Sequence, residues 1–356
     1  MHEWTRVNRL GRLMGGTPSM RRLYRLILKA STVDMPVLIV GETGSGKELV
    51  ALEIHERSAR KDKPFVAVNT GVLSAELVAS ELFGHVKGAF TGADSDKVGR
   101  FSEAYGGTLF LDEVATMRDS VQVALLRVLE DGLFRPVGGE IDQAADVRII
   151  AATNVCQQQA LIQSGFREDL LHRLQVVRIP VPSLSERVED IPMLVRALLV
   201  DVNEKFDFNL DGISDAALET FKKYPWPGNV RELKNTIYQA ALMAERGILQ
   251  PQHIPARIVN FLLERTAETA PNDRVPDGKP ETTAGLEFSK PNGPGSHPLA
   301  GPQETMSIPA GATLEEVQKA YMMNVLSRCL GNKTRAAKIL GISRKTLHEH
   351  IKKWDH

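Results

Sequence analysis

The sequence predicts an α/β domain with a parallel sheet, a small helical region after it and an all-α module at the C-terminal end. Three observations carry this prediction. Short apolar runs alternate with helical patterns from residue 37 to residue 152, as in parallel sheets covered by helices on both faces. Strand patterns stop at Ser183, and helical patterns continue to residue 245. The last residues form a helix, a glycine turn and a helix.

Composition sets the class of protein. The 356 residues are enough for about two or three domains. Lys+Arg and Asp+Glu number 44 each, so net charge alone indicates no polyanionic partner. Two distant cysteines, Cys156 and Cys329, argue against a zinc site or a disulfide framework. No apolar run reaches the roughly 18 residues of a membrane span, and the N-terminus lacks an apolar signal core. We therefore expect a cytoplasmic protein without a membrane partner.

Residues 41–48, G-E-T-G-S-G-K-E, have the sequence of a phosphate-binding loop. An apolar strand precedes them and a helical pattern follows, which is the setting that such a loop requires. The glycines allow backbone N–H groups to approach phosphate oxygens, and Lys47 can reach the β- and γ-phosphates. Glu48 stands where Ser or Thr usually contacts Mg²⁺. The alternative is a glycine-rich turn without a ligand, which the flanking strand and helix disfavour. The predicted nucleotide contacts are Gly41, Glu42, Thr43, Gly44, Ser45, Gly46, Lys47 and Glu48.

Two carboxylates end the predicted strand 106–111. An apolar strand that ends in Asp112 and Glu113, downstream of a phosphate loop, is typical of a nucleotide site. Asp112 would hold Mg²⁺, commonly through water, because this ion keeps much of its hydration shell. Glu113 could orient and deprotonate an attacking water. Either residue alone could cap a helix, but the pair together with the phosphate loop favours a role in metal binding and catalysis.

Two other predicted strands also end in polar residues. Asn69 ends the strand 64–68, and Thr153 and Asn154 end the strand 147–152. Ligands of α/β sheets bind at the carboxyl ends of the strands. For Asn69, a place in the site and a simple turn at a strand end are equally compatible with the sequence.

Residues 88–93, G-A-F-T-G-A, match neither a core strand nor a strong helix. Small residues flank a single aromatic ring, so the sequence predicts a mobile loop with Phe90 at or near its tip. The alternative folds Phe90 into the domain as an anchor, which is in general the commoner case.

Arg167 and Arg173 lie six positions apart on a predicted helix that also carries Glu168 and Asp169. A solvated, salt-bridged face is the usual interpretation of such a run. Arginines that complete the site of a neighbouring subunit are rarer, and the pattern alone leaves both interpretations open.

Helical patterns after Ser183 cover residues 187–206, 214–222 and 229–245. Asn229 is expected to cap the third helix, with Glu232 as its reciprocal partner, which places Arg231 near a helix start. Residues 271–302 then hold seven prolines and five glycines, a composition that predicts a flexible tether.

The C-terminal residues predict a helix-turn-helix. Thr313 and Glu316 form a capping box for a first helix, and Gly341 separates a short helix from a final one. From Asn332 onward there are seven Lys/Arg and two Asp/Glu, a net charge of +5 (7 − 2) that favours nucleic acid over an ordinary solvated face. The predicted DNA contacts are Thr334, Ser343, Arg344, Lys345, Thr346, His348 and Lys352.

Six motifs carry a resemblance to a known family. They are GETGSGKE (41–48), ELFGHVKGAFTGA (81–93), GGTLFLDE (106–113), AATN (151–154), FREDLLHRL (166–174) and WPGNVRELKN (226–235). With them the chain resembles the bacterial enhancer-binding proteins, the AAA+ activators of sigma-54 RNA polymerase, over residues from about 15 to 262. Its C-terminal end is similar to the Fis-type helix-turn-helix. Within the AAA+ class, the hexapeptide GAFTGA marks these activators.

The resemblance implies a role for each motif. Residues 41–48 would be the Walker A loop, and Asp112 and Glu113 the Walker B pair, with Asn69 as the switch residue that holds Glu113. The remaining roles are sensor I for Thr153 and Asn154, sensor II for Arg231, arginine fingers for Arg167 and Arg173, and contact with the sigma factor for Gly88, Ala89, Phe90, Thr91, Gly92 and Ala93. The implied parts are a short N-terminal segment (1–14), an AAA+ α/β subdomain (15–182), a helical lid (183–262), a flexible linker (263–308) and the DNA-binding domain (309–356).

The resemblance also implies an activity. ATP with Mg²⁺ would bind between subunits of a ring, expected to be a hexamer, and hydrolysis would remodel the closed complex of sigma-54 RNA polymerase from upstream enhancer DNA. Fourteen residues before the ATPase part cannot hold a receiver domain, so control is expected from a separate trans-acting protein or from expression level. The alternatives are a DNA-binding regulator with an inactive ATPase domain and another AAA+ motor.

Two stretches depart from the pattern of the resembled family. Its usual Asn-Cys-Ala-Ala is Asn69-Thr70-Gly71-Val72 here. Its usual Glu-Arg-Val-Gly-Gly is Arg135-Pro136-Val137-Gly138-Gly139, so the conformation of this loop beside GAFTGA cannot be carried over.

Overall fold

The computed structural model describes residues 8–71 and 75–268, which form an α/β domain and a smaller region that we call the lid, residues 184–268. Both belong to one compact unit. Most of the predicted linker, the helix-turn-helix and all seven predicted DNA contacts lie outside the described residues.

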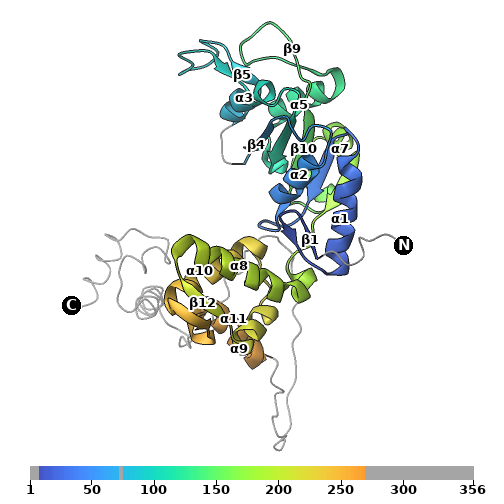
Figure 1. Cartoon of the computed structure of the whole chain (residues 1–356). Coiled ribbons are helices and arrows are strands. Elements are labelled where there is room, and N and C mark those ends of the chain that lie inside the picture. Colours follow the sequence, from blue (N-terminus) through green and yellow to red (C-terminus); the bar gives the residue numbers. More distant parts are fainter. Residues whose placement is uncertain (1–7, 72–74, 269–356) are drawn as a thin grey trace, which may run out of the picture. The chain divides into compact units, whose positions relative to one another are not determined.

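A five-stranded parallel sheet forms the centre of the α/β domain (Figure 1). In spatial order its strands are β11 (Val177–Pro180), β3 (Val37–Val40), β10 (Arg148–Thr153), β7 (Thr108–Asp112) and β4 (Phe65–Asn69). The sequence patterns predicted four of these strands and missed β11. An edge position explains the omission, because an edge strand tolerates the proline and the charged residue that interrupt its apolar pattern.

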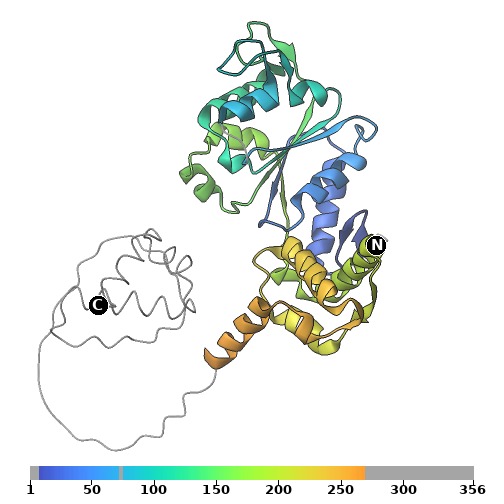
Figure 2. The same ribbon diagram turned by 90° about the vertical axis from the view of Figure 1, so that its left-hand side faces the viewer.

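Helices cover both faces of the sheet (Figure 1 and Figure 2). Alternate residues of a strand point to opposite faces, so Val37 and Ile39 of β3 enter one core while Leu38 and Val40 enter another. The first core contains α1 (Pro18–Ser31) and α2 (Lys47–Glu56), and the second contains α3 (Ala75–Phe83), α5 (Asp119–Asp131), α6 (Gln158–Gln163) and α7 (Glu168–Leu174). All four residues of β3 are buried, which accounts for the unbroken apolar run before the phosphate loop.

The parallel register gathers the polar strand ends at one edge of the sheet. Asn69 pairs with Asp112 across β4 and β7, and Thr153 pairs with Val40 across β10 and β3. Since the chain enters the phosphate loop directly after Val40, this edge carries the residues predicted to contact nucleotide.

Three short antiparallel hairpins extend from the domain. They are β1 (Arg9–Leu10) with β2 (Leu13–Met14), β5 (Gly84–His85) with β6 (Lys97–Val98), and β8 (Leu133–Phe134) with β9 (Gln143–Ala144). A short helix, α4 (Arg100–Glu103), follows β6. The GAFTGA residues thus lie between two paired strands.

The lid has its own apolar core, formed by α8 (Ile191–Phe206), α9 (Asp215–Lys223), α10 (Asn229–Ala244) and α11 (Ala256–Glu268). Helices α8, α9 and α10 agree with the three predicted helices, except that a 3-10 helix over Ser185–Asp190 replaces the expected first turn of α8. Helix α11 was not predicted. The expectation of no strands after Ser183 was wrong. A parallel pair, β12 (Asn209–Ile213) with β13 (Arg246–Leu249), lies in this region, and both strands are too polar and too rich in glycine to show a strand pattern.

Candidate nucleotide site

The phosphate loop leads from β3 into α2 through two glycines in the left-handed conformation, Gly44 with φ 77° and Gly46 with φ 103°. Lys47 is the first residue of α2 and is buried. Its ammonium group donates to the carbonyl oxygens of Gly41, at 2.9 Å, and Glu42, at 3.1 Å. The loop therefore has the backbone geometry, the helix N-terminus and the cation that a phosphate group requires.

Asp112 and Glu113 lie at the end of β7, close enough to the phosphate loop to act on Lys47. Burial lowers the pKa of Lys47 below its ordinary value. The carboxylates of Asp112, more strongly, and Glu113, less strongly, oppose that shift. Two carboxylates near one ammonium group are typical of sites that bind Mg²⁺ and nucleotide phosphates.

The backbone at Glu113 is in the left-handed region, with φ 58° and ψ 39°. A residue other than glycine in this conformation stores strain, and such residues cluster at functional sites. Asp112 Oδ1 accepts a hydrogen bond from the Glu113 N–H at 2.9 Å, which fixes the turn.

The structure brings Asn69 to the same place. Asn69 lies beside Asp112, its register partner at the strand ends, and its Oδ1 accepts a hydrogen bond from Gly71 N at 2.8 Å. The Thr70 hydroxyl lies 2.9 Å from the Asp112 carbonyl oxygen and 3.1 Å from that of Glu113. The turn after β4 and the carboxylate pair after β7 are therefore joined by hydrogen bonds.

Thr153 and Asn154 border the start of the phosphate loop. Gly41 N donates to the Thr153 carbonyl oxygen at 3.2 Å. Thr153 is buried and accepts a bond from Val155 N, whereas Asn154 is exposed. Cys156, which no sequence motif assigned to the site, is exposed and lies near Lys47.

The lid closes over the phosphate loop through the start of α10. Arg231 N donates to the Gly44 carbonyl oxygen at 3.3 Å, and Arg231 acts on Lys47 as a like charge. A methyl group at Gly44 would stand 2.3 Å from the Gly228 carbonyl oxygen, so this position requires glycine. Arg231 therefore lies beside the phosphate loop, and its contact with nucleotide stays a prediction.

The expected capping role of Asn229 was wrong. Gly228 is the N-cap of α10, and its N–H donates to Glu232 Oε2 at 2.9 Å, so Glu232 reaches back to Gly228 rather than to Asn229 as predicted. The Asn229 side chain instead donates to Glu42 Oε2 and the Thr43 carbonyl oxygen and accepts from Leu184 N. Asn229 is completely buried, with φ 51°. These long-range bonds compete with the local cap, and the motif around Arg231 was the only available signal for them.

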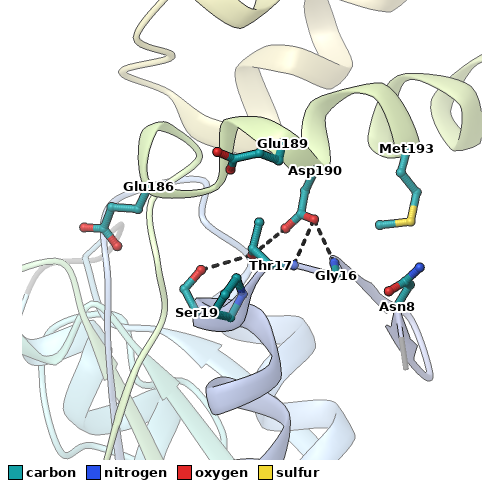
Figure 3. Close-up of a pocket in the computed structure, with 9 residues that line it drawn as sticks. Asn8, Gly16, Thr17, Ser19, Glu186, Glu189, Asp190 and Met193 are labelled. Carbon is teal, nitrogen blue, oxygen red and sulfur yellow. Dashed lines mark hydrogen bonds between the residues drawn. The ribbon is translucent and has the colours of Figure 1, made fainter. Parts of the chain in front are cut away.

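Two further residues at the start of the lid carried no recognisable sequence signal. Arg187 is buried and donates to the carbonyl oxygens of Ser45 and Met14, both at 3.4 Å. Asp190 accepts from Gly16 N, at 2.7 Å, and from the N–H and hydroxyl groups of Thr17, at 3.2 and 2.8 Å (Figure 3). Asp190 therefore fixes the turn that precedes α1 to the start of the lid.

A pocket of about 740 Å³ lies beside this contact (Figure 3). It is lined by Asn8, Gly16, Thr17, Pro18, Ser19, Glu186, Glu189, Asp190 and Met193. The Asp190 carboxylate on the pocket wall already accepts hydrogen bonds from Gly16 and Thr17, as the dashed lines in Figure 3 show.

The GAFTGA residues form a tight turn rather than an extended arm. Gly88 N donates to the Ala93 carbonyl oxygen at 2.9 Å, and Ala93 N donates to that of Phe90 at 3.0 Å. Phe90 is half-buried, and its ring meets the His85 ring edge-on with 4.9 Å between centroids. Phe90 is thus neither fully exposed nor a core anchor in this structure.

The loop with the unusual Pro136 packs against this turn. Val86 N donates to the Val137 carbonyl oxygen, and Val137 N donates to that of Gly84, at 3.1 and 2.9 Å. A methyl group at Gly138 would stand 2.7 Å from Ala89 Cβ. Pro136 itself leaves these bonds intact, because they use the backbone of its neighbour.

Among the described residues, no group of three or more His, Cys, Asp or Glu side chains could hold a metal ion unaided. Mg²⁺ in nucleotide enzymes is bound through one or two carboxylates together with the substrate phosphates and water. Asp112 beside the phosphate loop fits that kind of site.

Comparison with known proteins shows the family of this chain. Three family models match: the Sigma-54 interaction domain over residues 13–180, the AAA+ ATPase lid domain over 185–271 and the Fis family of bacterial regulatory proteins over 313–354. The transcriptional regulator NtrC of Azospirillum brasilense is 38% identical over 96% of this chain and 69% of its own length. XylR of Pseudomonas putida is 37% identical over 96% of this chain and 57% of its own length. The chain belongs to the sigma-54-dependent AAA+ transcription activators.

A solved relative supports the fold of this activator. NtrX from Brucella abortus, crystallised with ATP, is 31% identical and superposes with a TM-score of 0.65 over 97% of this chain and 70% of its own. The predicted AAA+ domain, lid and Fis-type helix-turn-helix are confirmed by the matching family models. No helix in the described part of the activator is long and apolar enough to span a membrane.

The expected arginine fingers of the activator pair with carboxylates in the isolated chain. Arg167 contacts Asp119 and Asp169, at 3.3 and 2.7 Å, and Arg173 contacts Glu130 at 3.3 Å. Both arginine side chains are more than one-third exposed. These contacts match the salt-bridged surface that the sequence left open, and a role toward a neighbouring subunit remains a prediction.

Proposed function

We propose that this chain is an ATPase that uses hydrolysis to remodel the sigma-54 RNA polymerase closed complex. The observation that carries the proposal is the convergence of Lys47, Asp112, Glu113 and Arg231 on one phosphate loop. Lys47 provides a cation for the phosphates, and Asp112 provides a carboxylate for a metal ion. Glu113 provides a second carboxylate, on a residue with strained backbone. Because the chain belongs to a family of sigma-54 activators, we take sigma-54 RNA polymerase as its partner.

In the proposed reaction, residues 41–48 hold the phosphates through backbone N–H groups and the Lys47 ammonium. Asp112 would hold Mg²⁺, which offsets negative charge on the phosphates. Glu113 orients a water molecule and accepts its proton, and Asn69 holds Glu113 between turnovers. Thr153 and Asn154, from the core, and Arg231, from the lid, contact the nucleotide.

We also propose that the active form is a ring, in which Arg167 and Arg173 reach the nucleotide of the neighbouring subunit. Charge supplied across a subunit boundary makes hydrolysis depend on assembly, as with other arginine fingers. Residues 88–93 would contact the sigma factor, with Phe90 as the apolar part of that contact. The helix-turn-helix would hold the ring at upstream enhancer DNA, and a trans-acting protein would control it.

The decisive experiment measures phosphate release and open-complex formation in one preparation with sigma-54 holoenzyme and promoter DNA. We expect ATP to support both, and ADP to support neither. ATP hydrolysis without open complexes would point to another AAA+ motor. DNA binding without phosphate release at any protein concentration would point to a regulator with an inactive ATPase domain.

A further inference from the structure

Helix α1 carries positive charge that nothing in its own sequence balances. Four of its 14 residues are Lys or Arg and none is Asp or Glu, in a chain whose total charge is zero. One side of the helix packs into the domain, where Leu23 and Ile27 are buried. The opposite side exposes Arg22, Arg25 and Lys29, which we call the basic ridge. Because these residues stand at positions i, i+3 and i+7, they form one row about 10 Å long.

No carboxylate in the described part of the chain neutralises the basic ridge. Its three side chains form neither a salt bridge nor a hydrogen bond with any residue of 8–71 or 75–268. Cations of neighbouring segments do pair, since Arg12 contacts Glu56 at 3.2 Å and Arg60 contacts Asp34 at 2.7 Å. The ridge therefore presents its full charge to solvent.

The row is unfavourable for the helix itself. Like charges three or four residues apart repel each other on a helix surface, whereas opposite charges at the same spacing stabilise the helix. Arg25 has a like charge at both spacings, with Arg22 on one side and Lys29 on the other. The stability of the fold thus gives no reason for the ridge, and an anion bound from outside would relieve the repulsion.

The chemistry of this surface favours nucleic acid over an acidic protein. Contacts between proteins depend on apolar anchors that become buried, and no large apolar side chain is exposed from residue 8 to residue 32. Interfaces with DNA are more polar and much more positively charged. Two of the three ridge residues are arginines, whose guanidinium groups bind phosphate through two parallel hydrogen bonds. The Fis family match at residues 313–354 makes DNA a ligand of this chain already.

We propose that the basic ridge of α1 is a second DNA-binding surface, which contacts the phosphate backbone and reads no sequence. It is separate from the Fis-type helix-turn-helix and works without nucleotide. Cations that bind phosphates release counterions from DNA, so the contact strengthens as the salt concentration falls. The ridge adds affinity for DNA of any sequence, and specificity stays with the helix-turn-helix.

The test measures binding of the full chain to a short DNA duplex of random sequence, without nucleotide, over a series of salt concentrations. The ridge variant removes all three charges and keeps long side chains: Arg22→Gln, Arg25→Gln and Lys29→Gln. The control variant removes three exposed charges of the same kinds from separate elements of the lid, α8, α9 and β13: Arg196→Gln, Lys223→Gln and Arg246→Gln.

We expect the ridge variant to bind the duplex at least about tenfold more weakly than the control variant at about 50 mM salt. The slope of log Kd against log salt should be smaller by about 2–3, because each lost phosphate contact removes about 0.9. Melting temperature should not fall below that of the control variant, since the substitutions remove repulsion within α1. An unchanged slope would overturn the proposal, and so would a lower melting temperature.

A third variant keeps the charge and exchanges the side chains: Arg22→Lys, Arg25→Lys and Lys29→Arg. Its DNA affinity should stay within a few-fold of the wild type, and a loss as large as that of the ridge variant would overturn the proposal. A fluorescent polyglutamate peptide serves as a second probe. If the ridge variant loses polyglutamate binding and keeps the DNA slope, the ridge binds an acidic protein instead. Since these measurements need no ATP, absence of phosphate release would defeat the proposed function and leave this test intact.

Discussion

Asn229 of the lid donates its side-chain amide to the carboxylate of Glu42 in the phosphate loop, with 2.9 Å between Nδ2 and Oε2. The same nitrogen lies 3.1 Å from the Thr43 carbonyl oxygen, and the Asn229 amide oxygen accepts from Leu184 N at 2.7 Å. One buried side chain therefore joins the loop that would hold phosphates to the first residue of the lid. This contact also sets the position of Arg231, two residues further along α10.

We expect Asn229→Ala to weaken nucleotide binding and to destabilise the fold. Alanine leaves the buried Leu184 N–H without a partner, which costs about 1–3 kcal/mol, and it keeps a φ of 51° that suits glycine or asparagine better. Thermal unfolding and ATP titration on the same sample measure both effects. Glu42→Gln is the milder comparison, because its amide oxygen can still accept from Asn229. Equal effects of the two substitutions would mean that the contact between Asn229 and Leu184 contributes little.

Lys47→Ala and Glu113→Gln should separate binding from turnover. Lys47→Ala removes a charge-assisted contact to phosphate, worth about 1.5–3 kcal/mol, so we expect ATP affinity to fall by about tenfold or more. Glu113→Gln keeps the size of the side chain and removes the base, so ATP should bind while phosphate release stops. Fluorescent-nucleotide titration and a phosphate-release assay distinguish the two. Similar affinity and similar turnover in both variants would contradict the assigned roles.

Mixed rings test the arginine fingers. Arg167→Ala and Glu113→Gln should each abolish ATP turnover alone, yet a mixture should regain part of it, because some interfaces would pair an intact arginine with an intact Glu113. Arg173→Ala should behave in the same way. The measurement is phosphate release across mixing ratios, with mixed assembly checked by mass spectrometry. If mixed rings form and no ratio recovers turnover, the arginines act within their own subunit or only in the surface pairs with Asp119, Asp169 and Glu130.

Phe90→Ala should keep ATP hydrolysis within a few-fold and abolish sigma-54 binding and open-complex formation. The ring is half-buried against His85, so its loss should cost about 0.5–1.5 kcal/mol of stability from the aromatic pair. Melting temperature, phosphate release and open-complex formation are measured on one preparation. Simultaneous loss of all three would mean that the loop is part of the core rather than a contact surface.

The sequence by itself determined the local parts of this protein. The phosphate loop is readable because a buried strand, glycines and a helix start follow one another within residues 37–56, and each has a distinct local pattern. The carboxylate pair at the end of β7 is readable for the same reason. The family motifs supplied the order of the domains.

Only the tertiary structure decided which distant residues meet. Asn229 and Glu42 lie 187 positions apart, and Gly71 contacts Glu113 because β4 and β7 are neighbours in the sheet. Local propensity favoured Asn229 as a helix cap, but a buried amide with three long-range partners gains more from those bonds than from capping its own helix. The strands β11, β12 and β13 carry weak patterns, because an edge position and a two-stranded sheet place few demands on side chains. Local sequence patterns predict the secondary structure of a segment. The packing of the sheet and the lid decides which distant side chains come within hydrogen-bond distance of each other.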